Sequence, residues 1–417
     1  MRAKPFPSSF FTKNRQALRE ALPDGSLGLI FSGEEQVRNH DQKHPFRVDS
    51  NFFYLTGLET PGAMLILLPE SAGKQGEKIY IPPVDLTKEQ WEGKMLGLAE
   101  ATKLSGCKSI FLTTDFEQHL FGLQKEAEVL YTEVNQVFAK GHISSFQVFL
   151  RDLNLRLPHL QIKKIDPFIV PLRAKKQKPE INRIKESLGI IERAYGRVSS
   201  VLSPNLFEYQ IEAEIARQYL WEGCDRLGFD TIVAGGKNAA TLHYVTNHCK
   251  LKKQDMVLID TGGEYGMYSG DITRVFPVSG KFTAKQKKYY QAVLEVNKEM
   301  TDWVQAGFSW KEVAEKASYV QGQVYKKAKI IKDSTEHQKV SLHRIGHSLG
   351  LDVHDLQKAD SILPINAVIT IEPGLYLPNE GIGIRIEDDV LLNERGCEVL
   401  SKGIPKEIKD LEEMMGN

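Results

Sequence analysis

The sequence predicts two domains, an α/β domain over residues 1–172 and an α+β domain over residues 173–417. Three observations support this fold class. The chain has 417 residues, more than one compact core usually organises, and 41% of them are hydrophobic, which is enough for two cores. Short β-rich runs alternate with helical stretches in the first part, as in α/β domains. The second part twice repeats a helix-rich and then a strand-rich stretch.

The first domain is predicted from β-rich runs that helical stretches separate. The runs are residues 27–31, 52–55, 63–68, 78–81 and 109–112. The chain changes character at Arg173, where the basic segment RAKKQK precedes Pro179, Glu180 and then apolar residues at helical spacing. We place the domain boundary there and interpret RAKKQK, residues 173–178, as a solvated linker.

The second domain has a weak internal symmetry. A helix-rich stretch at about 179–222 precedes a strand-rich one at about 229–278, and a helical stretch at about 283–329 precedes strand-rich residues at about 340–400. Two similar αβ halves that pack face to face would leave a cleft between them. We therefore expect a pseudo-twofold arrangement with a central cleft.

Composition argues against several classes of protein. Lys+Arg and Asp+Glu both number 54, without the basic excess of a phosphate-backbone binder, so no nucleic-acid partner is expected. The longest apolar stretches, such as residues 63–69, are far shorter than the roughly 20 residues that cross a bilayer, so no membrane association is expected. The N-terminal residues lack a secretory signal and the 4 cysteines form no CxxC pair, which favours reduced thiols in the cytoplasm.

Residues 256–278, MVLIDTGGEYGMYSGDITRVFPV, are predicted to form a hairpin that carries two acids. The flanks are strand-like, and the glycine-rich middle suits a turn. A turn centred on Tyr265 and Gly266 would place Asp260 directly opposite Asp271, about 5 Å apart between Cβ atoms.

Residues 367–392, AVITIEPGLYLPNEGIGIRIEDDVLL, are predicted to form a second acidic hairpin. A turn centred on Asn379 and Glu380 would oppose Glu372 and Glu387, although a proline follows Glu372 and can interrupt the ladder. Arg385 lies two residues before Glu387 and shares its face of the strand.

Opposed like charges destabilise a sheet, so something must compensate these acids. The pairs can share a proton, form salt bridges or coordinate a cation, and two such pairs favour the cation. Solvent-facing acids on an ordinary sheet are the alternative from spacing alone.

Histidines then favour a metal site. The segment SLHRIGHSLGLDVHDL contains His343, His347 and His354, and His243 precedes the first hairpin. The pair His343 and His347 has the spacing of a helical zinc motif, but Arg344 replaces its glutamate, so we reject that reading. One histidine among four carboxylates favours manganese over structural zinc, with cobalt or iron as alternatives.

The motifs VLIDTG, GDITR, GHSLGLDVHD, TIEPGLY and IRIEDD, in this order, resemble the five-ligand signature of pita-bread metallopeptidases. The resemblance covers the second domain and implies the pita-bread fold and two divalent metal ions, which we expect to be manganese, with cobalt, iron or zinc as the other options. The metal ligands that it implies are Asp260, Asp271, His347, Glu372 and Glu387. Asp271 and Glu387 would bridge the two ions, and Glu372 would also serve as general base.

The resemblance also implies residues that handle substrate and protons. His243, His354 and Arg385 match catalytic positions, and His343 and Tyr376 match positions that line the pocket. The first domain, through HPFRVDSNFFYLTGLETPGAMLIL and IPPVDLTKEQWEGKMLG, resembles the N-terminal domain of bacterial Xaa-Pro aminopeptidases, in which the tryptophan matching Trp91 lies near the active-site mouth. A core position is the alternative for Trp91.

The implied activity is metal-dependent removal of the first residue from peptides with proline in second position. The implied partners are such a peptide and further copies of the chain, in a dimer or tetramer. A prolidase that splits Xaa-Pro dipeptides and a non-catalytic pita-bread module that binds peptides or proteins are the alternatives. Two departures from the family, Arg344 where glycine is frequent and a short loop at residues 376–381, bear on peptide length.

Overall fold

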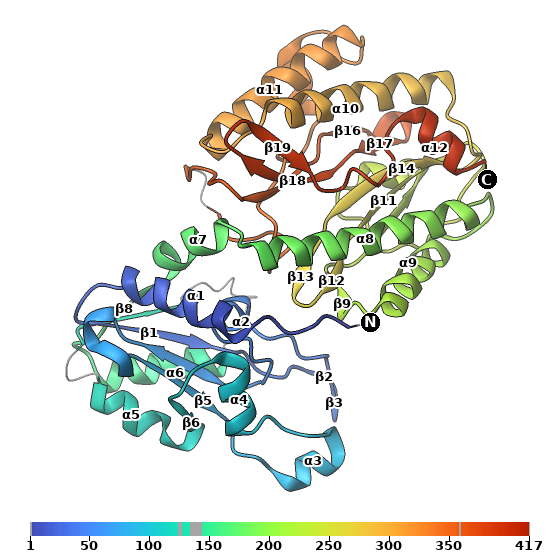
Figure 1. Ribbon diagram of the computed structural model, residues 1–417. Helices are drawn as coiled ribbons and strands as arrows, with labels where there is room; N and C mark the ends of the chain where they lie inside the picture. Colours follow the sequence, from blue (N-terminus) through green and yellow to red (C-terminus); the bar gives the residue numbers. More distant parts are fainter. Residues whose placement is uncertain (1, 124–126, 134–143, 358–359, 417) are drawn as a thin grey trace. The chain divides into compact units, whose positions relative to one another are not determined.

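The computed structural model of the protein describes residues 2–123, 127–133, 144–357 and 360–416 (Figure 1). The chain divides into two compact units, Pro5–Leu172 and Arg173–Asn417, the second of which includes Met1–Lys4. Every helix of the described residues is too short or too polar to span a membrane.

The unit Pro5–Leu172 is built on a mixed sheet with the strand order β6-β5-β4-β1-β7-β8. β1 pairs antiparallel with β4 and parallel with β7. The strands are β1 Ser26–Phe31, β4 Met64–Leu67, β5 Glu77–Ile81, β6 Ile110–Leu112, β7 Val129–Thr132 and β8 Gln161–Lys164, beside the ribbon β2 Val37–Asn39 and β3 Gln42–Lys43. The helices are α1 Ser8–Ala21, α2 Ser50–Thr56, α3 Leu86–Glu92, α4 Leu98–Ser105, α5 Phe116–Leu123, α6 Ser145–Arg156 and α7 Asp166–Ala174, with 3₁₀ segments Glu70–Gln75 and Thr113–Asp115.

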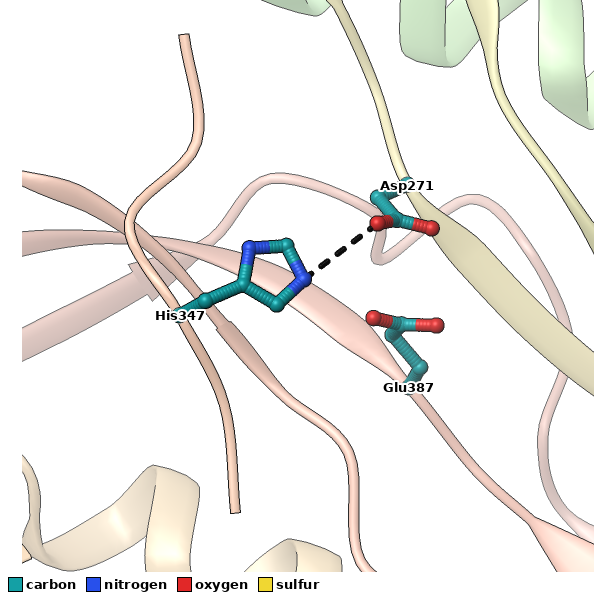
Figure 2. A group of neighbouring side chains, drawn as sticks. All are labelled: Asp271, His347 and Glu387. Carbon is teal, nitrogen blue, oxygen red and sulfur yellow. Dashed lines mark ion pairs between the residues drawn. The ribbon is translucent and has the colours of Figure 1, made fainter. Parts of the chain in front are cut away.

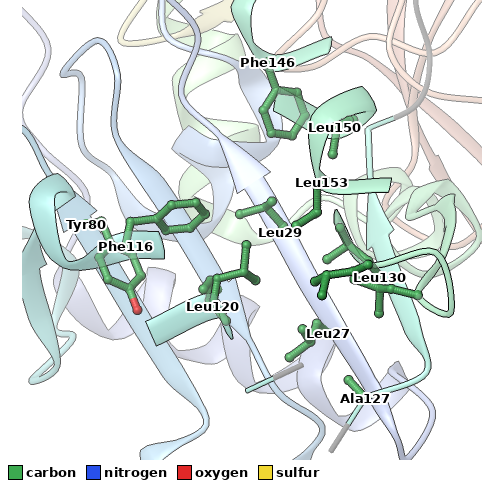
Figure 3. Packing of buried hydrophobic residues seen from close by; sticks show 13 residues of the cluster. Leu27, Leu29, Tyr80, Phe116, Leu120, Ala127, Leu130, Phe146, Leu150 and Leu153 are labelled. Carbon is green, nitrogen blue, oxygen red and sulfur yellow. The ribbon is translucent and has the colours of Figure 1, made fainter. Parts of the chain in front are cut away.

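The core of this unit lies between the sheet and two helices (Figure 3). Leu27 and Leu29 of β1 belong to one buried cluster with Leu120 of α5 and with Leu150 and Leu153 of α6. Helical spacing of three or four residues places such side chains on a single face of each helix, so burial of that face holds both helices on the sheet.

One predicted strand of this domain is wrong. Residues 52–55 lie in helix α2, whose side chains are all buried. The Asp49 carboxylate caps the helix by accepting the N–H of Phe52 at 2.8 Å, and Gly57 ends it in the left-handed region at φ 68°. A short run buried on every side has no period that distinguishes helix from strand.

The second unit repeats one order of elements, as the sequence predicts. Two helices, α8 Lys178–Val201 and α9 Glu208–Glu222, precede β9 Arg226–Leu227, β10 Ile232–Gly235, β11 Met256–Thr261, β12 Gly263–Tyr265, β13 Tyr268–Ser269 and β14 Ile272–Pro277. Two more, α10 Ala284–Trp303 and α11 Trp310–Lys327, precede β15 Val368–Ile371, β16 Gly374–Leu377, β17 Ile382–Arg385, β18 Asp388–Asn393 and β19 Gly396–Val399. The unit also holds α12 Ile408–Met414 and the 3₁₀ segments Gly236–Ala240, Ser334–Lys339 and Pro378–Glu380.

Helix α8 supports the strands that carry the first two acids. Its buried residues Ile184, Leu188 and Ile191 recur at helical spacing, and the fully buried Tyr195 continues the same face. The Tyr195 hydroxyl lies 2.9 Å from the carbonyl oxygen of Ile259 in β11 and 2.8 Å from that of Ile272 in β14. The helix therefore anchors both strands beside Asp260 and Asp271.

The interpretation of residues 173–178 as a solvated linker is wrong. Arg173 and Lys176 are each 2% exposed. Both reach the buried Asp355 carboxylate, with Nη2 of Arg173 at 2.5 Å and Nζ of Lys176 at 2.8 Å. The two cations are buried because they have a buried anionic partner.

Candidate functional site

The first hairpin has a register that differs by two residues from the predicted one. Asp260 pairs with Thr273 across β11 and β14, and Asp271 precedes β14. The turn is centred on Gly266 and Met267, both with positive φ, because β12 and β13 continue the hairpin with Tyr265 opposite Tyr268. A shift of two residues keeps side chains on the same face, so Asp260 and Asp271 both line one cavity although they are not directly opposed.

The second hairpin has the predicted register. Gly374 pairs with Arg385 in the ladder of β16 and β17, and Ile371 pairs with Asp388 in that of β15 and β18. Glu372 and Glu387 lie between these two ladders, at the interruption expected next to Pro373. Their side chains are thus placed at a break in the sheet and line the same cavity as the first two acids.

Asp271, His347 and Glu387 form a compact group (Figure 2). One potential ligand atom from each lies within 4.8 Å of the others, and Nε2 of His347 is 3.4 Å from Oδ2 of Asp271. The backbone N–H of His347 donates to the Thr370 hydroxyl at 3.0 Å, and its Nδ1 donates to the Ser348 carbonyl at 3.0 Å. These two bonds aim Nε2 at the carboxylates, as is usual for metal-binding histidines.

Glu372 and Asp260 complete the group of five predicted ligands, which are four acids and one histidine. Oε1 of Glu372 is 3.5 Å from Nε2 of His347. Oδ2 of Asp260 is 2.6 Å from Nη2 of Arg385, and the buried Oδ1 of Asp260 has no hydrogen-bond partner. The five predicted ligands line one cavity of about 300 Å³, together with His243, His343, His354 and Arg385.

The electrostatics of this cavity favour a bound cation. Burial and the neighbouring carboxylate of Asp271 raise the pKa of Asp260 to about 6, although Arg385 lowers it. Burial, opposed by His347 and Arg385, raises the pKa of Glu372 to about 7. Burial and the charges of Asp271 and Glu372 hold the pKa of Glu387 well above its usual range. Divalent cations would relieve this repulsion and use the vacant Oδ1 of Asp260, so the residues fit a metal centre of mixed oxygen and nitrogen ligands.

Arg385, Tyr376 and His343 form a chain of hydrogen bonds that starts beside Asp260. Arg385 donates through Nη1 to the Tyr376 hydroxyl at 3.0 Å, and that hydroxyl lies 2.7 Å from Nε2 of His343. Nδ1 of His343 donates to the Arg344 carbonyl at 2.8 Å, so Nε2 accepts from Tyr376. Burial and the Arg385 charge lower the pKa of His343 to about 4, and its ring is therefore neutral at neutral pH.

Comparison with known proteins decides the family. Residues 182–394 match the model of metallopeptidase family M24, and residues 11–131 match that of the aminopeptidase P N-terminal domain. The chain belongs to metallopeptidase family M24. It is 33% identical to the Xaa-Pro aminopeptidase of Escherichia coli and 34% identical to that of Haemophilus influenzae, over 97% and 98% of this chain and 97% of each relative.

Solved structures agree with this M24 assignment. Aminopeptidase P from Escherichia coli with the inhibitor Pro-Leu superimposes with a TM-score of 0.89 at 31% identity and covers 99% of both chains. The family and the fold class that the motifs predict are thus confirmed, and the chain is a metallopeptidase of a family that uses divalent metal ions.

The remaining predicted residues of the M24 site lie in different places. His243 and His354 line the cavity of about 300 Å³ that contains the five predicted ligands, which we call the metal cavity. The centroid of the His354 ring is 4.2 Å from that of the His347 ring. Burial and His347 lower the pKa of His354. Trp91 lies on α3 in the other unit and is 85% exposed, so the alternative of a core position for it is wrong.

Sequence reasoning missed three residues that hold the predicted ligands. The Thr273 hydroxyl donates to Oε2 of Glu387 at 2.7 Å, and that of Thr370 donates to Oε1 of Glu372 at 3.2 Å. Oδ2 of Asp389 accepts the backbone N–H of Asp271 at 3.1 Å. Thr273, Thr370 and Asp389 each lie two positions from a predicted ligand, so the two-residue period of strands was the signal that could have found them.

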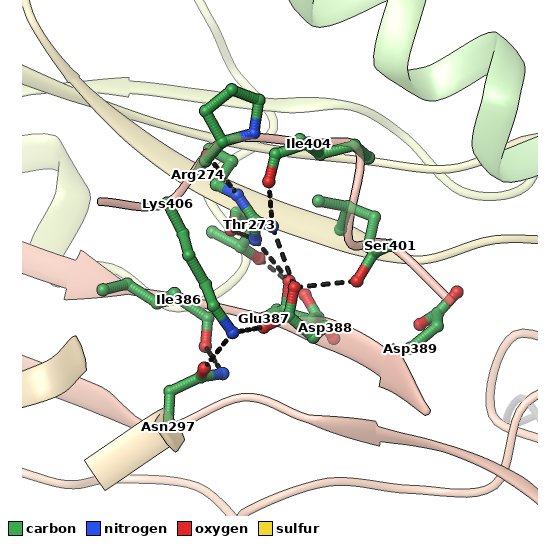
Figure 4. A network of polar contacts seen from close by, with 12 residues as sticks. Thr273, Arg274, Asn297, Ile386, Glu387, Asp388, Asp389, Ser401, Ile404 and Lys406 are labelled. Atoms are coloured by element: carbon green, nitrogen blue, oxygen red, sulfur yellow. Dashed lines mark hydrogen bonds and ion pairs between the residues drawn. The ribbon is translucent and has the colours of Figure 1, made fainter. Parts of the chain in front are cut away.

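A buried network fixes the backbone behind Glu387 (Figure 4). Arg274 donates to the Glu387 carbonyl at 2.5 Å and to Oδ1 of Asp388 at 2.8 Å, and Lys406 lies 2.5 Å from Oδ2 of Asp388. Burial opposes ionisation of Asp388, but the charges of Arg274 and Lys406 lower its pKa to about 2. Because Asp388 is charged and paired, it orients β18 and the adjacent Glu387.

Proposed function

We propose that this chain is an Xaa-Pro aminopeptidase that removes the first residue from peptides with proline in second position. The observation that carries the proposal is the convergence of four carboxylates and His347 in one cavity whose other walls include His243, His343, His354 and Arg385. The full-length similarity to Xaa-Pro aminopeptidases selects the reaction among those of the family.

The residues proposed to hold two divalent ions are Asp260, Asp271, His347, Glu372 and Glu387. Bound there, such ions supply a strongly acidified water as nucleophile. The oxygen-rich donor set favours manganese, with cobalt, iron and zinc as alternatives. Metal analysis of protein purified without added metal tests this preference.

Glu372 is the proposed general base. Its carboxylate lines the same cavity as the other predicted ligands, and carboxylates are among the side chains that serve as general bases. It would take the proton of the attacking water and return it to the proline nitrogen as the peptide bond breaks. That nitrogen carries no N–H in the substrate, so its protonation must accompany bond cleavage.

The histidines and Arg385 are proposed to position substrate. His243 and His354 would donate hydrogen bonds to the substrate backbone and to the oxygen that gains charge in the transition state. Arg385 would hold Asp260 and, through Tyr376, the neutral His343 against the proline side of the cavity.

A manganese-dependent assay with three peptides tests the proposal. Ala-Pro-Ala should release alanine, Ala-Ala-Ala should stay intact, and a chelator should abolish activity until manganese is added back. An Asp271→Asn variant serves as the inactive control. Cleavage of Ala-Pro but not of Ala-Pro-Ala would instead indicate a prolidase. Binding of all three peptides without any cleavage would indicate a peptide-binding module.

We further propose that the enzyme works in the cytoplasm as a homo-oligomer, dimer or tetramer, in which Trp91 borders the entrance for substrate. The 85% exposure of Trp91 and the free state of the described cysteines support this proposal. Light scattering measures the mass of the assembly. In the assembled enzyme, Trp91→Ala should raise KM for Ala-Pro-Ala with little change in kcat.

A further inference from the structure

A second cavity of about 360 Å³ adjoins the metal cavity in the unit Arg173–Asn417. The two cavities share Arg344, Gly346 and Gln357 in their linings. Trp310 and Ala314 of α11, with Ile345, give the second cavity an apolar wall. A peptide substrate that extends from the metal cavity past Arg344 and Gly346 would therefore enter a space with an apolar wall.

The polar groups of the second cavity are mainly hydrogen-bond donors. The exposed Arg344 guanidinium has no hydrogen bond or ion pair among the described residues. Trp310 is 9% exposed, and its buried Nε1 has no partner. Oε1 of Gln357 accepts from the N–H and the hydroxyl of Ser348, at 3.0 and 3.1 Å, which leaves its amide nitrogen as the donor. Such a lining suits an anionic ligand. The charges of the exposed Lys311 and Asp360, which also line the cavity, balance one another.

A third cavity of about 350 Å³ has the opposite character. It shares Asp260, Asp271, His243 and His354 with the metal cavity, and Asp230 adds a third acid beside apolar walls that include Phe229 and Ile232. We call the second cavity the donor-lined cavity and the third the acidic cavity. Each adjoins the metal cavity, and they share different residues with it. A short peptide, with its amine at one end and its carboxylate at the other, has the same polarity.

We propose that the donor-lined cavity binds the third residue of an Xaa-Pro-Xaa tripeptide, and that Arg344 pairs with the terminal carboxylate of this residue. Gln357 adds a single hydrogen bond through its amide nitrogen, and the apolar wall, which includes Trp310, takes an apolar side chain. Arg344 is thus a residue that determines specificity for short peptides with a free carboxyl end. The inference rests on the proposed function, because it needs a substrate with proline in second position.

The test compares Ala-Pro-Leu with its C-terminal amide on the manganese-loaded full-length enzyme. Wild-type enzyme should cleave the free acid with a kcat/KM about tenfold higher than the amide, mainly through KM. Arg344→Gln should lower kcat/KM for the acid about tenfold and leave the amide unchanged. Arg395→Gln, at an exposed arginine outside the three cavities, should change neither. The rate on the amide also shows whether each variant is folded.

Four outcomes would overturn the inference. Equal rates on acid and amide with wild-type enzyme would leave the proposed function standing and refute the carboxylate site. An equal loss on both substrates in Arg344→Gln would mean that Arg344 acts elsewhere. Absence of cleavage of either peptide would refute the proposed function and this inference together. Calorimetric binding of the product Pro-Leu should weaken about tenfold in Arg344→Gln, and unchanged affinity would also count against the site.

Discussion

Arg385 and Asp260 form a buried ion pair, with Nη2 of the arginine 2.6 Å from Oδ2 of the carboxylate. The pair joins β17 to β11, which belong to different halves of the second unit. Because Arg385 occupies one oxygen of Asp260 and the other has no partner, the arginine both neutralises the acid and leaves Oδ1 for a ligand.

Replacing Arg385 by methionine should therefore weaken metal binding. Without the guanidinium, the pKa of Asp260 would rise further above about 6, and its proton would compete with metal. We expect metal affinity to fall about 10- to 100-fold, measured by competition with a chelator. Arg38→Met, at an exposed position on β2, is the control. Unaltered affinity in Arg385→Met would show that the pair does not support the centre.

Much of the site could be predicted from the sequence because its ligands lie in short motifs. The register of the second hairpin followed from its symmetric flanks and from a turn that closes at Gly381, with φ 63°. The first register could not be read correctly because Met267 adopts φ 74°, a conformation for which non-glycine residues give no clear signal. The even shift still left both acids on one face.

Long-range pairing is what sequence patterns did not show. Residues 173–178 have the composition of a solvated linker, yet Arg173 and Lys176 are buried against Asp355, about 180 positions away. Likewise, the support that Arg385 gives Asp260 depends on the approach of two strands far apart in the chain. The resemblance supplied the fold, whereas these contacts needed the structure.

Metal binding should depend steeply on pH. In the metal-free site, burial opposes protonation of His347, but the hydrogen bond and charge of Asp271 raise its pKa to about 9. Glu372, with its pKa of about 7, must also release its proton to bind metal. Affinity should thus rise at least about tenfold per pH unit between pH 7 and 9 and more steeply below pH 7, and Glu387, whose pKa is also raised, adds to this dependence. Titrations with manganese between pH 6 and 9 measure this slope, and a flat profile would contradict it.

His354→Ala should slow the reaction without emptying the metal site. The ring lines the metal cavity and lies beside His347, but sequence and structure give no reason to count it among the ligands. Loss of one hydrogen bond to the developing charge should lower kcat by about two orders of magnitude, while manganese content stays at the wild-type value. His248→Ala, at an exposed histidine outside the cavities, is the matched control. A normal rate, or loss of manganese, would remove the proposed role of His354.

Asp355→Asn should destabilise the fold. The change removes the buried anion that pairs with Lys176 and leaves Arg173 its ion pair with the partly exposed Asp352, which costs about 3–5 kcal/mol of unfolding free energy. Urea titrations of wild type and variant measure this cost. As a control, Lys185→Met, which breaks an exposed pair with Glu398, should cost at most about 1 kcal/mol.

The pH dependence of stability gives a second measure of the same cluster. Burial opposes ionisation of Asp355, but Arg173 and Lys176 lower its pKa below the unfolded value of about 3.9. Its folded state therefore binds fewer protons than its unfolded state, so the stabilisation is complete above pH 4 and is lost as pH falls through the lower folded pKa. The Asp355→Asn variant should lack this part of the acid transition. If wild type and variant lost stability in parallel between pH 4 and 2, the cluster would not be the source of acid sensitivity.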